Sequence, residues 1–117
     1  MKHLFIPYEL AVIAKEKGFN EPCLAKHDLK HILLRVEECK SQEQASEFEY
    51  ILAPLYQQIV DWFREKHNIA IEINFGVMGY MVNVYKIRTT SLIFQSERIN
   101  LYYEALNKAI EEAFKLI

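Results

Sequence analysis

The clearest hydrophobic pattern in the chain covers residues 54–67, where apolar residues recur at helical spacing and polar residues fill the positions between them. Pro54 suits the first position of a helix because its φ angle is fixed. Asn68, just beyond the pattern, can take the left-handed conformation that ends a helix. We therefore predict a helix over 54–67, with Trp62 and Phe63 on its buried face.

Two other segments have helical periodicity. Residues 7–17 begin at a proline and are followed by Gly18 and Phe19, a sequence typical of a left-handed helix stop. A final helix is expected over 100–116. Its predicted apolar stripe consists of Tyr103, Leu106, Ala109, Ile110, Ala113, Phe114 and Ile117. Two i,i+4 ion pairs are expected on its polar face, Glu104–Lys108 and Glu111–Lys115.

Strict alternation of apolar and polar residues over 69–75 predicts a half-buried strand. The next four residues, 76–79, include two glycines and predict a turn, after which residues 80–88 return as the partner strand. Residues 89–99 are expected to form a connection with a short extended piece at 92–94.

Residues 23–38 fit two structures. They can form two strands joined at 28–30, or a helix that starts at Asp28, because the apolar residues that follow are also at helical spacing: Leu29, Ile32, Leu33 and Val36. We favour the hairpin. Residues 40–53 begin with a polar stretch and are expected to form an exposed loop or a frayed turn.

The chain has 117 residues, 51% of them hydrophobic and 26% charged, which is typical of one globular domain over residues 1–117. The expected class is α+β, with two α-β-β units forming an antiparallel sheet packed by three helices, and the C-terminal helix as a cap. A weak internal echo supports the two units: residues 15–17 and 64–66 each end a helix that begins at a proline.

The formal net charge of −2 gives no overall positive field that would attract nucleic acid or anionic lipid. Cys23 and Cys39 are the only cysteines, so no disulfide framework is expected, and two buried thiols in a reducing compartment are favoured over a single bridge. No apolar stretch approaches the length of a membrane span. We therefore expect a cytoplasmic protein with no membrane association.

The only spacing that suggests metal ligands is that of Cys23, His27 and His31, which would share one face of a helix. A hairpin would separate His31 from the other two. The chain has no glycine-rich phosphate loop, no metalloprotease motif and no serine-hydrolase motif. We therefore expect no catalytic residue, no metal and no cofactor, and a protein that is not an enzyme.

A surface for interactions is expected along the second strand of the predicted hairpin. Its candidate residues are Met78, Tyr80, Tyr85, Lys86 and Arg88. Tyrosine and methionine are enriched at protein interfaces, so an unidentified protein partner is the leading expectation. The alternative is a single-stranded nucleic-acid-binding module that uses the Tyr80–Arg88 strand, with aromatic rings for stacking and two basic residues for phosphates. A homodimer is also considered, because it would cover any part of the last helix's stripe that one core leaves exposed.

Three segments carry a resemblance to a known family: residues 61–67 with the isoleucine-rich strand after them, residues 103–113, and the opening residues 14–23. They resemble those of a family of small, uncharacterised proteins encoded by bacteriophages and prophages of gut bacteria. The resemblance covers about half of the chain and omits residues 28–50. Its motifs are packing motifs, so it implies a fold and carries over no functional residue. The expected function is that of a phage- or prophage-type accessory protein acting through protein–protein contacts.

Overall fold

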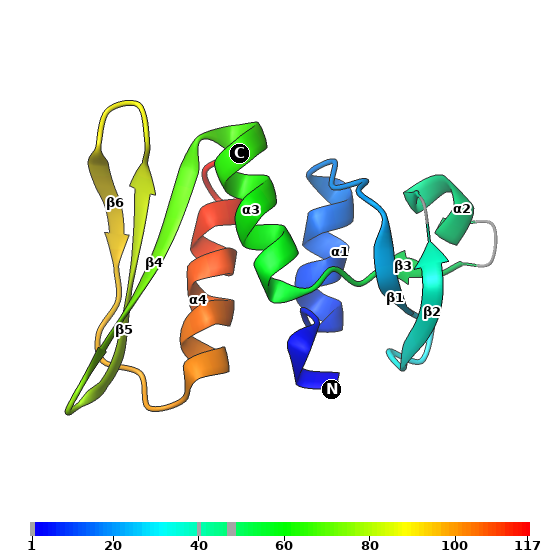
Figure 1. The fold of residues 1–117 in the computed structure, drawn as a ribbon, viewed down its shortest axis with the longest axis horizontal. Helices are drawn as coiled ribbons and strands as arrows, with labels where there is room; N and C mark the ends of the chain where they lie inside the picture. Colours follow the sequence, from blue (N-terminus) through cyan, green and yellow to red (C-terminus); the bar gives the residue numbers. More distant parts are fainter. Residues whose placement is uncertain (1, 40, 47–48) are drawn as a thin grey trace. The chain divides into compact units, whose positions relative to one another are not determined.

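The computed structural model describes residues 2–39, 41–46 and 49–117, and it confirms the α+β class. The chain divides into two compact units, residues 1–58 and 59–117, which are described separately. The first unit contains, after a short 3-10 helix, α1 (Tyr8–Glu16), β1 (Cys23–His27), β2 (Leu33–Cys39), α2 (Gln42–Ser46) and β3 (Ile51–Leu52) (Figure 1). The second contains most of α3 (Tyr56–His67), then β4 (Ile69–Gly76), β5 (Gly79–Lys86), β6 (Ser91–Gln95) and α4 (Tyr102–Phe114).

Helix α1 ends as its sequence predicts. Gly18 has a φ of 93°, and the Phe19 N–H donates to the Ala14 carbonyl at 2.9 Å, which closes the last turn. Phe19 is buried. Among the described residues, no helix is long and apolar enough to cross a membrane.

The first unit confirms the hairpin at residues 23–38, because β1 pairs with β2 in antiparallel register. Asp28 organises the turn: its side chain accepts hydrogen bonds from the N–H groups of Lys30, at 2.8 Å, and Ile32, at 2.9 Å. The segment 40–53 is not simply a loop, since it includes α2 and the two-residue strand β3. Strand β3 pairs with the other side of β1, so the strand order is β2-β1-β3.

Backbone hydrogen bonds join the residues that follow β3 to the N-terminal segment on one side and to β1 on the other. The Ile6 N–H donates to the Pro54 carbonyl at 3.0 Å, and the Ala53 N–H donates to the Ala25 carbonyl at 3.0 Å. Phe5, Ala25 and Ala53 form a small buried cluster at this point. These contacts position the cavity described below.

The second unit forms its own three-stranded antiparallel sheet in the order β4-β5-β6. The strands therefore form two sheets where one was expected. Both units begin with a helix and a hairpin, as the α-β-β pattern predicts, but the central strand is the first of the hairpin in one unit and the second in the other. Within the expected connection 89–99, strand β6 includes the short extended piece expected at 92–94, and it pairs with β5.

Helix α4 packs along one face of this sheet, chiefly against β5, and its apolar stripe supplies much of the core of the unit (Figure 1). The aromatic residues of α3 complete that core. The Phe63 ring lies 4.9 Å from the Phe114 ring and 5.3 Å from the Trp62 ring. The stripe residues that are buried are Leu106, Ala109, Ile110, Ala113 and Phe114. The stripe is thus core packing, and it leaves little apolar surface for a second copy to cover.

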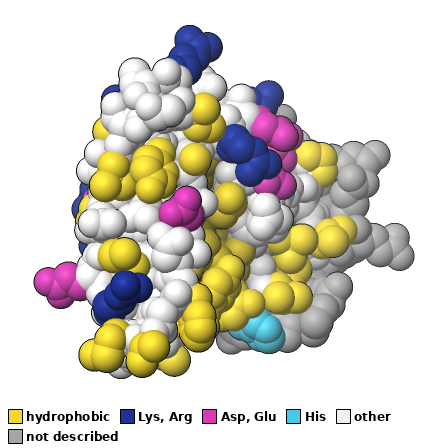
Figure 2. Space-filling model, turned by 60° about the vertical axis from the view of Figure 1, so that its left-hand side comes forward, with side chains coloured by type: hydrophobic (Ala, Val, Ile, Leu, Met, Phe, Trp, Pro, Cys, Tyr) yellow, Lys and Arg dark blue, Asp and Glu magenta, His cyan; other side chains and the backbone are white. Residues whose placement is uncertain are grey.

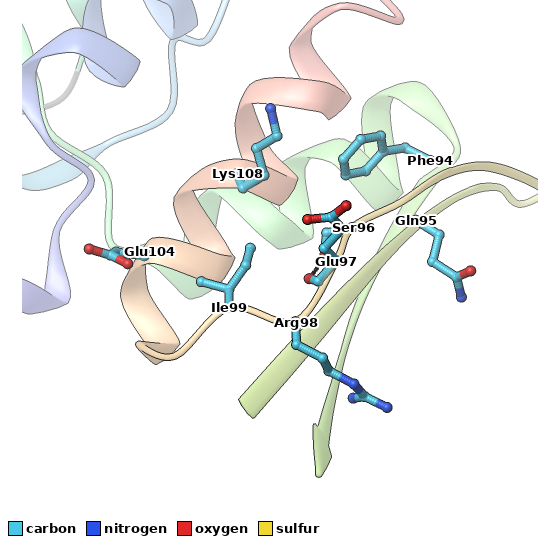
Figure 3. Close-up of a pocket in the computed structure, with 8 residues that line it drawn as sticks. All are labelled: Phe94, Gln95, Ser96, Glu97, Arg98, Ile99, Glu104 and Lys108. Carbon is cyan, nitrogen blue, oxygen red and sulfur yellow. Dashed lines mark hydrogen bonds between the residues drawn. The ribbon is translucent and has the colours of Figure 1, made fainter. Parts of the chain in front are cut away.

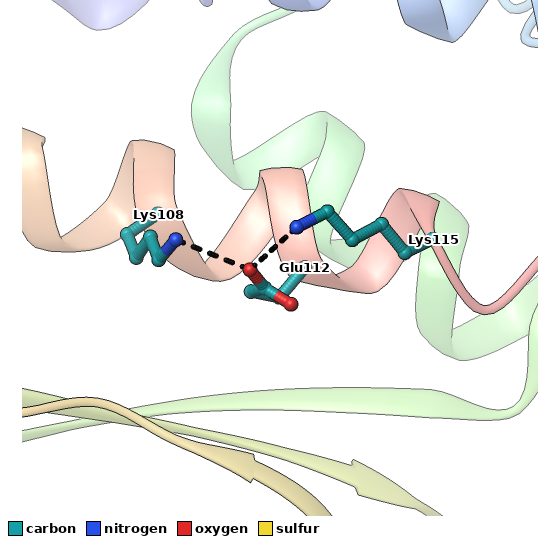
Figure 4. Close-up of polar contacts among 3 residues, drawn as sticks. All are labelled: Lys108, Glu112 and Lys115. Atoms are coloured by element: carbon teal, nitrogen blue, oxygen red, sulfur yellow. Dashed lines mark hydrogen bonds and ion pairs between the residues drawn. The ribbon is translucent and has the colours of Figure 1, made fainter.

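The polar face of α4 holds an ion-pair cluster that differs from the predicted pairs. Lys108 Nζ lies 3.1 Å from Glu112 Oε1, and Lys115 Nζ lies 2.9 Å from the same oxygen (Figure 4). Both lysines thus pair with Glu112 instead of with the expected glutamates. The hydrogen bond from Lys115, followed by that from Lys108, lowers the pKa of Glu112. Both lysines are exposed, so the cluster contributes little to stability.

The buried aromatic cluster predicts the effect of truncating Phe63. The Phe63→Ala substitution removes a fully buried ring and should lower the free energy of unfolding by about 3–5 kcal/mol. Phe75→Ala deletes the same atoms from an exposed site and serves as the matched control, with an expected loss of about 0.5 kcal/mol. Urea unfolding followed by circular dichroism measures both. Equal losses in the two variants would contradict the assigned core.

Candidate functional site

The structure separates the five predicted interaction residues into two groups. Met78 lies in the turn that precedes β5, and Tyr80 is the second residue of that strand. Tyr85, Lys86 and Arg88 lie at the other end. Since a strand rises about 3.3 Å per residue, the two groups are separated by more than about 15 Å.

The two tyrosines also occupy opposite faces of the sheet. Tyr80 pairs with Phe75, and its ring lies 5.5 Å from the ring of Tyr102 at the start of α4. Tyr85 has the opposite parity along β5 and pairs with Ala70. Tyr80 and Tyr85 are both half-buried, whereas Lys86 and Arg88 are exposed. The structure therefore does not bring the five residues together on one surface.

One group belongs to an exposed apolar patch at the tip of the β4–β5 hairpin. This hairpin-tip patch consists of Phe75, Val77 and Met78, whose exposed fractions are 80%, 102% and 73%. Figure 2 shows hydrophobic side chains gathered at the lower end of the molecule, where this tip lies. The half-buried Tyr80 ring lies next to the patch, with its centroid 5.6 Å from the centroid of the Phe75 ring.

The base of the tip is held firmly by backbone contacts. Tyr80 and Ile99 exchange two backbone hydrogen bonds, with N···O distances of 2.8 and 2.7 Å. Gly79 has a φ of 111°, and a Cβ atom at this position would lie 2.6 Å from the Ile99 carbonyl oxygen. Only glycine can therefore hold this close approach. The patch is presented by a fixed hairpin.

A surface groove of about 530 Å³ lies beside the connection between β6 and α4. It is lined by Phe94, Gln95, Ser96, Glu97, Arg98, Ile99, Glu104 and Lys108. Figure 3 shows that the side chains of Gln95, Arg98 and Glu104 point away from one another. The charged groups do not converge on a common point, so the groove lacks the arrangement that a catalytic site requires.

The sheet face opposite α4 carries a chain of polar side chains across all three strands. Gln95 Nε2 donates to Asn83 Oδ1 at 3.0 Å, and Asn83 Nδ2 donates to Glu72 Oε1 at 3.2 Å. Asn74 Nδ2 donates to the same Glu72 oxygen at 2.9 Å. These groups satisfy one another, and the buried Asn83 is thereby accommodated.

The first unit contains a cavity of about 410 Å³, within the range of small-molecule sites in proteins. It is lined by His3, Phe5, Ile6, Pro7, His27, Leu33 and Tyr56. Most of the lining is apolar or aromatic. The buried polar residue among them is His27, which lies directly opposite Leu33 in the β1–β2 register.

The hydrogen bonding of His27 determines its tautomer. His27 Nε2 lies 3.0 Å from the Ile6 carbonyl oxygen, which can only accept a hydrogen bond, so in the neutral ring the proton is on Nε2. Nδ1 then carries a lone pair. Nδ1 is buried and, within the described part of the chain, has no hydrogen-bond partner. The cavity is therefore lined by a residue with an unused acceptor.

The surroundings of His27 keep it neutral. Burial lowers the pKa of its imidazole, and nearby His31 acts in the same direction. The hydrogen bond to Ile6, together with Glu9 and Asp28, opposes this shift without reversing it.

The Tyr8 ring lies edge-on to His27, with the ring centroids 5.7 Å apart. The His31 ring stacks on the Tyr8 ring, with the two ring centroids 3.6 Å apart. His31 reaches this position because its φ of 64° turns the chain between β1 and β2.

The suggested metal ligands do not form a site. Across residues 2–39, 41–46 and 49–117, no group of three or more histidine, cysteine, aspartate or glutamate side chains could hold a metal ion. The Cys23 thiol is buried and donates to the Glu21 carbonyl at 3.3 Å. Cys39 is the register partner of Cys23 in the β1–β2 pair. The side chain of Cys39 is not among the described ones, so the prediction of two thiols is not tested at this residue.

Comparison of the chain with protein-family models, with curated proteins and with solved structures gave no match. What the protein does is therefore inferred from the hairpin-tip patch and the cavity.

The sequence analysis identified some of the residues of the hairpin-tip patch and of the cavity. It identified Met78 and Tyr80, but it assigned Phe75 to the buried face of β4 because the alternation of that strand is regular up to this residue. It noticed His27 only as a metal ligand. The cavity is formed by segments that are distant in the sequence, and no local pattern marks it.

The lowered pKa of His27 makes a prediction about acid stability. The unfolded state takes up a proton on this residue near pH 6.5, whereas the folded state does so only at lower pH. The stabilising effect of keeping the ring neutral is complete above pH 6.5 and is lost as the pH falls below it. Between the two pKa values the free energy of unfolding should fall by at most about 1.4 kcal/mol per pH unit.

The measurement is urea unfolding of the wild type and of His27→Leu at pH 8, 7, 6 and 5. The wild type should lose stability more steeply than the variant over the acid part of this range, because the carboxylates titrate alike in both. Parallel pH profiles would contradict the assigned neutral state of His27.

Proposed function

We propose that the protein is a non-enzymatic accessory protein of phage or prophage type that binds a partner protein through the hairpin-tip patch. The observation that supports this proposal is the exposure of Phe75, Val77 and Met78 at the end of a fixed hairpin. Contiguous exposed apolar patches are a common feature of interaction sites on folded proteins.

Turn chemistry gives no reason for these residues. Two-residue hairpin loops favour asparagine, aspartate and glycine, which adopt the required backbone angles and remain hydrated. Here the loop between Gly76 and Gly79 is Val77-Met78. Gly79 takes the positive φ angle of the turn, and Val77 and Met78 add apolar surface that a turn does not need.

The chemistry of the patch indicates the kind of partner. Met78 and Val77 offer a small, adaptable apolar surface, and Phe75 offers a flat aromatic one. The Arg98 guanidinium lies beside Gly76, 3.2 Å from where a Cβ of that residue would be. We infer a partner with an apolar pocket that has an acidic group at its rim.

The proposal is tested with the tagged 117-residue chain in lysates of a gut bacterium, using affinity purification and quantitative mass spectrometry. The Val77→Ser, Met78→Ser double variant should reduce recovery of a specific partner by about tenfold or more, which corresponds to the loss of a modest interface hot spot. Because both side chains are exposed, the variant should fold normally, and circular dichroism checks this.

The matched control is Lys86→Ser, Arg88→Ser, two exposed positions at the other end of β5. It should recover the partner as well as the wild type does. Equal loss in both double variants, or recovery that neither one changes, would contradict binding through the hairpin tip.

The alternative, a single-stranded nucleic-acid-binding module on the Tyr80–Arg88 strand, has less support from the geometry. Tyr80 and Tyr85 lie on opposite faces of the sheet, so the two rings cannot stack on successive bases of one strand. The carboxylate of Glu72 also lies on the Tyr85 face.

Fluorescence anisotropy with a labelled oligonucleotide tests this alternative. A nucleic-acid binder should lose affinity steeply as salt rises, and Lys86→Ser, Arg88→Ser should reduce the slope of log affinity against log salt by about 1.4 for two lost phosphate contacts. We expect no binding at 50 mM salt, a concentration at which phosphate contacts are strong. Salt-dependent binding that this variant weakens would support the alternative over a protein partner.

A further inference from the structure

The cavity of the first unit has walls that are set by the fold. Ile6 is anchored through its N–H to the Pro54 carbonyl and through its own carbonyl to His27 Nε2. Phe5 forms an antiparallel bridge with Leu55, next to Tyr56. Because backbone hydrogen bonds hold these segments, the cavity is part of the fold without a ligand, and a ligand needs side-chain movement only to reach Nδ1.

Its lining combines an apolar volume with the buried imidazole of His27. Phe5, Ile6 and Tyr56 are buried, and Pro7 and Leu33 are half-buried. His27 is only 5% exposed, yet its Nδ1 has no partner among the described residues. A buried polar atom that makes no hydrogen bond raises the free energy of the folded state, so this atom requires an explanation.

The tautomer specifies what can satisfy Nδ1. Its lone pair accepts a hydrogen bond and cannot donate one, because the single ring proton is held on Nε2 by the Ile6 carbonyl. A metal ion is not indicated, since no group of further ligands surrounds His27 in the described residues. A carboxylate or a phosphate would present only acceptors to this atom and would be buried among apolar groups.

We propose that the cavity beside His27 binds a compact, mostly apolar small molecule that donates a hydrogen bond from a hydroxyl or N–H group to His27 Nδ1. Aromatic alcohols are the simplest members of this class, since their rings suit the Phe5 and Tyr56 walls. Nδ1 has no surface open to solvent. A ligand therefore reaches it when side chains that line the cavity move aside.

The test uses the 117-residue chain and a matched pair of probes, p-cresol and p-xylene, which differ by one hydroxyl in place of a methyl group. Titrations are followed by NMR through backbone amide shifts and through the ¹⁵N shift of His27 Nδ1. We expect p-cresol to bind in the millimolar range, as is usual for such small ligands. It should shift the amides of the lining residues and move the Nδ1 signal in the direction of a new hydrogen bond.

The hydroxyl should make p-cresol bind about five- to tenfold more tightly than p-xylene, as is typical of one buried hydrogen bond. His27→Leu should remove this preference, and Leu33→Trp should abolish the binding of both probes by filling the cavity. Met78→Ser, in the second unit, should change neither. This control also separates the proposal from the proposed function, which depends on Met78 and not on His27.

Equal affinity of the two probes for the wild type, or p-cresol binding with no change at Nδ1, would overturn the proposal. So would an absence of any lining-residue shifts at about 10 mM p-cresol, well above the expected dissociation constant. These outcomes are read from the wild-type protein, so they remain decisive if a variant fails to fold.

Discussion

The hydrogen bond from His27 Nε2 to the Ile6 carbonyl is the interaction on which the first unit's candidate chemistry depends. It ties the segment before α1 to the central strand β1, and so it brings the N-terminal segment beside the sheet. It also places the ring proton on Nε2. The same contact that helps to form the cavity therefore leaves Nδ1, a buried acceptor, without a hydrogen-bond partner among the residues that the structure describes.

A comparable constraint acts in the second unit, where Gly79 permits the hairpin to approach Ile99. Any side chain at this position would meet the Ile99 carbonyl oxygen, and the paired hydrogen bonds of Tyr80 and Ile99 would be lost. Val77 and Met78 therefore lie at the end of a hairpin whose base is held by two backbone hydrogen bonds. An interface on such a hairpin loses little conformational entropy when a partner binds.

Much of the fold could be predicted from the sequence, because its elements follow local rules. The alternation over 69–75, the glycine at the end of α1 and the proline that precedes α3 each act within a few residues, and the structure has the corresponding elements. The apolar residues over 23–38 fitted both a helix and two strands, so local spacing alone did not decide between them. In the structure Asp28 is a turn residue of the hairpin and not a helix N-cap.

The errors come from interactions between distant residues. Strand β3 forms because it pairs with β1, and its two residues are too few to predict a strand from their own pattern. Phe75 continues the apolar face of β4 in sequence, yet it is exposed, because the hairpin extends beyond the core at that end. Lys108 and Lys115 both pair with Glu112, at i,i+4 and i,i+3 spacing, whereas each was expected to pair with the glutamate four residues before it. The cavity likewise depends on three segments meeting.

Stability alone gives a poor account of why a histidine occupies position 27. A donor to the Ile6 carbonyl is needed there, but a side chain that only donates, such as the indole of tryptophan, would supply it without a second nitrogen to bury. Histidine instead leaves Nδ1 unsatisfied, and it makes the unit sensitive to acid because a buried ring must charge as the pH falls. Both are costs to the folded state. They are offset when a ligand donates to Nδ1, since the cavity then holds a satisfied polar group and a filled apolar volume.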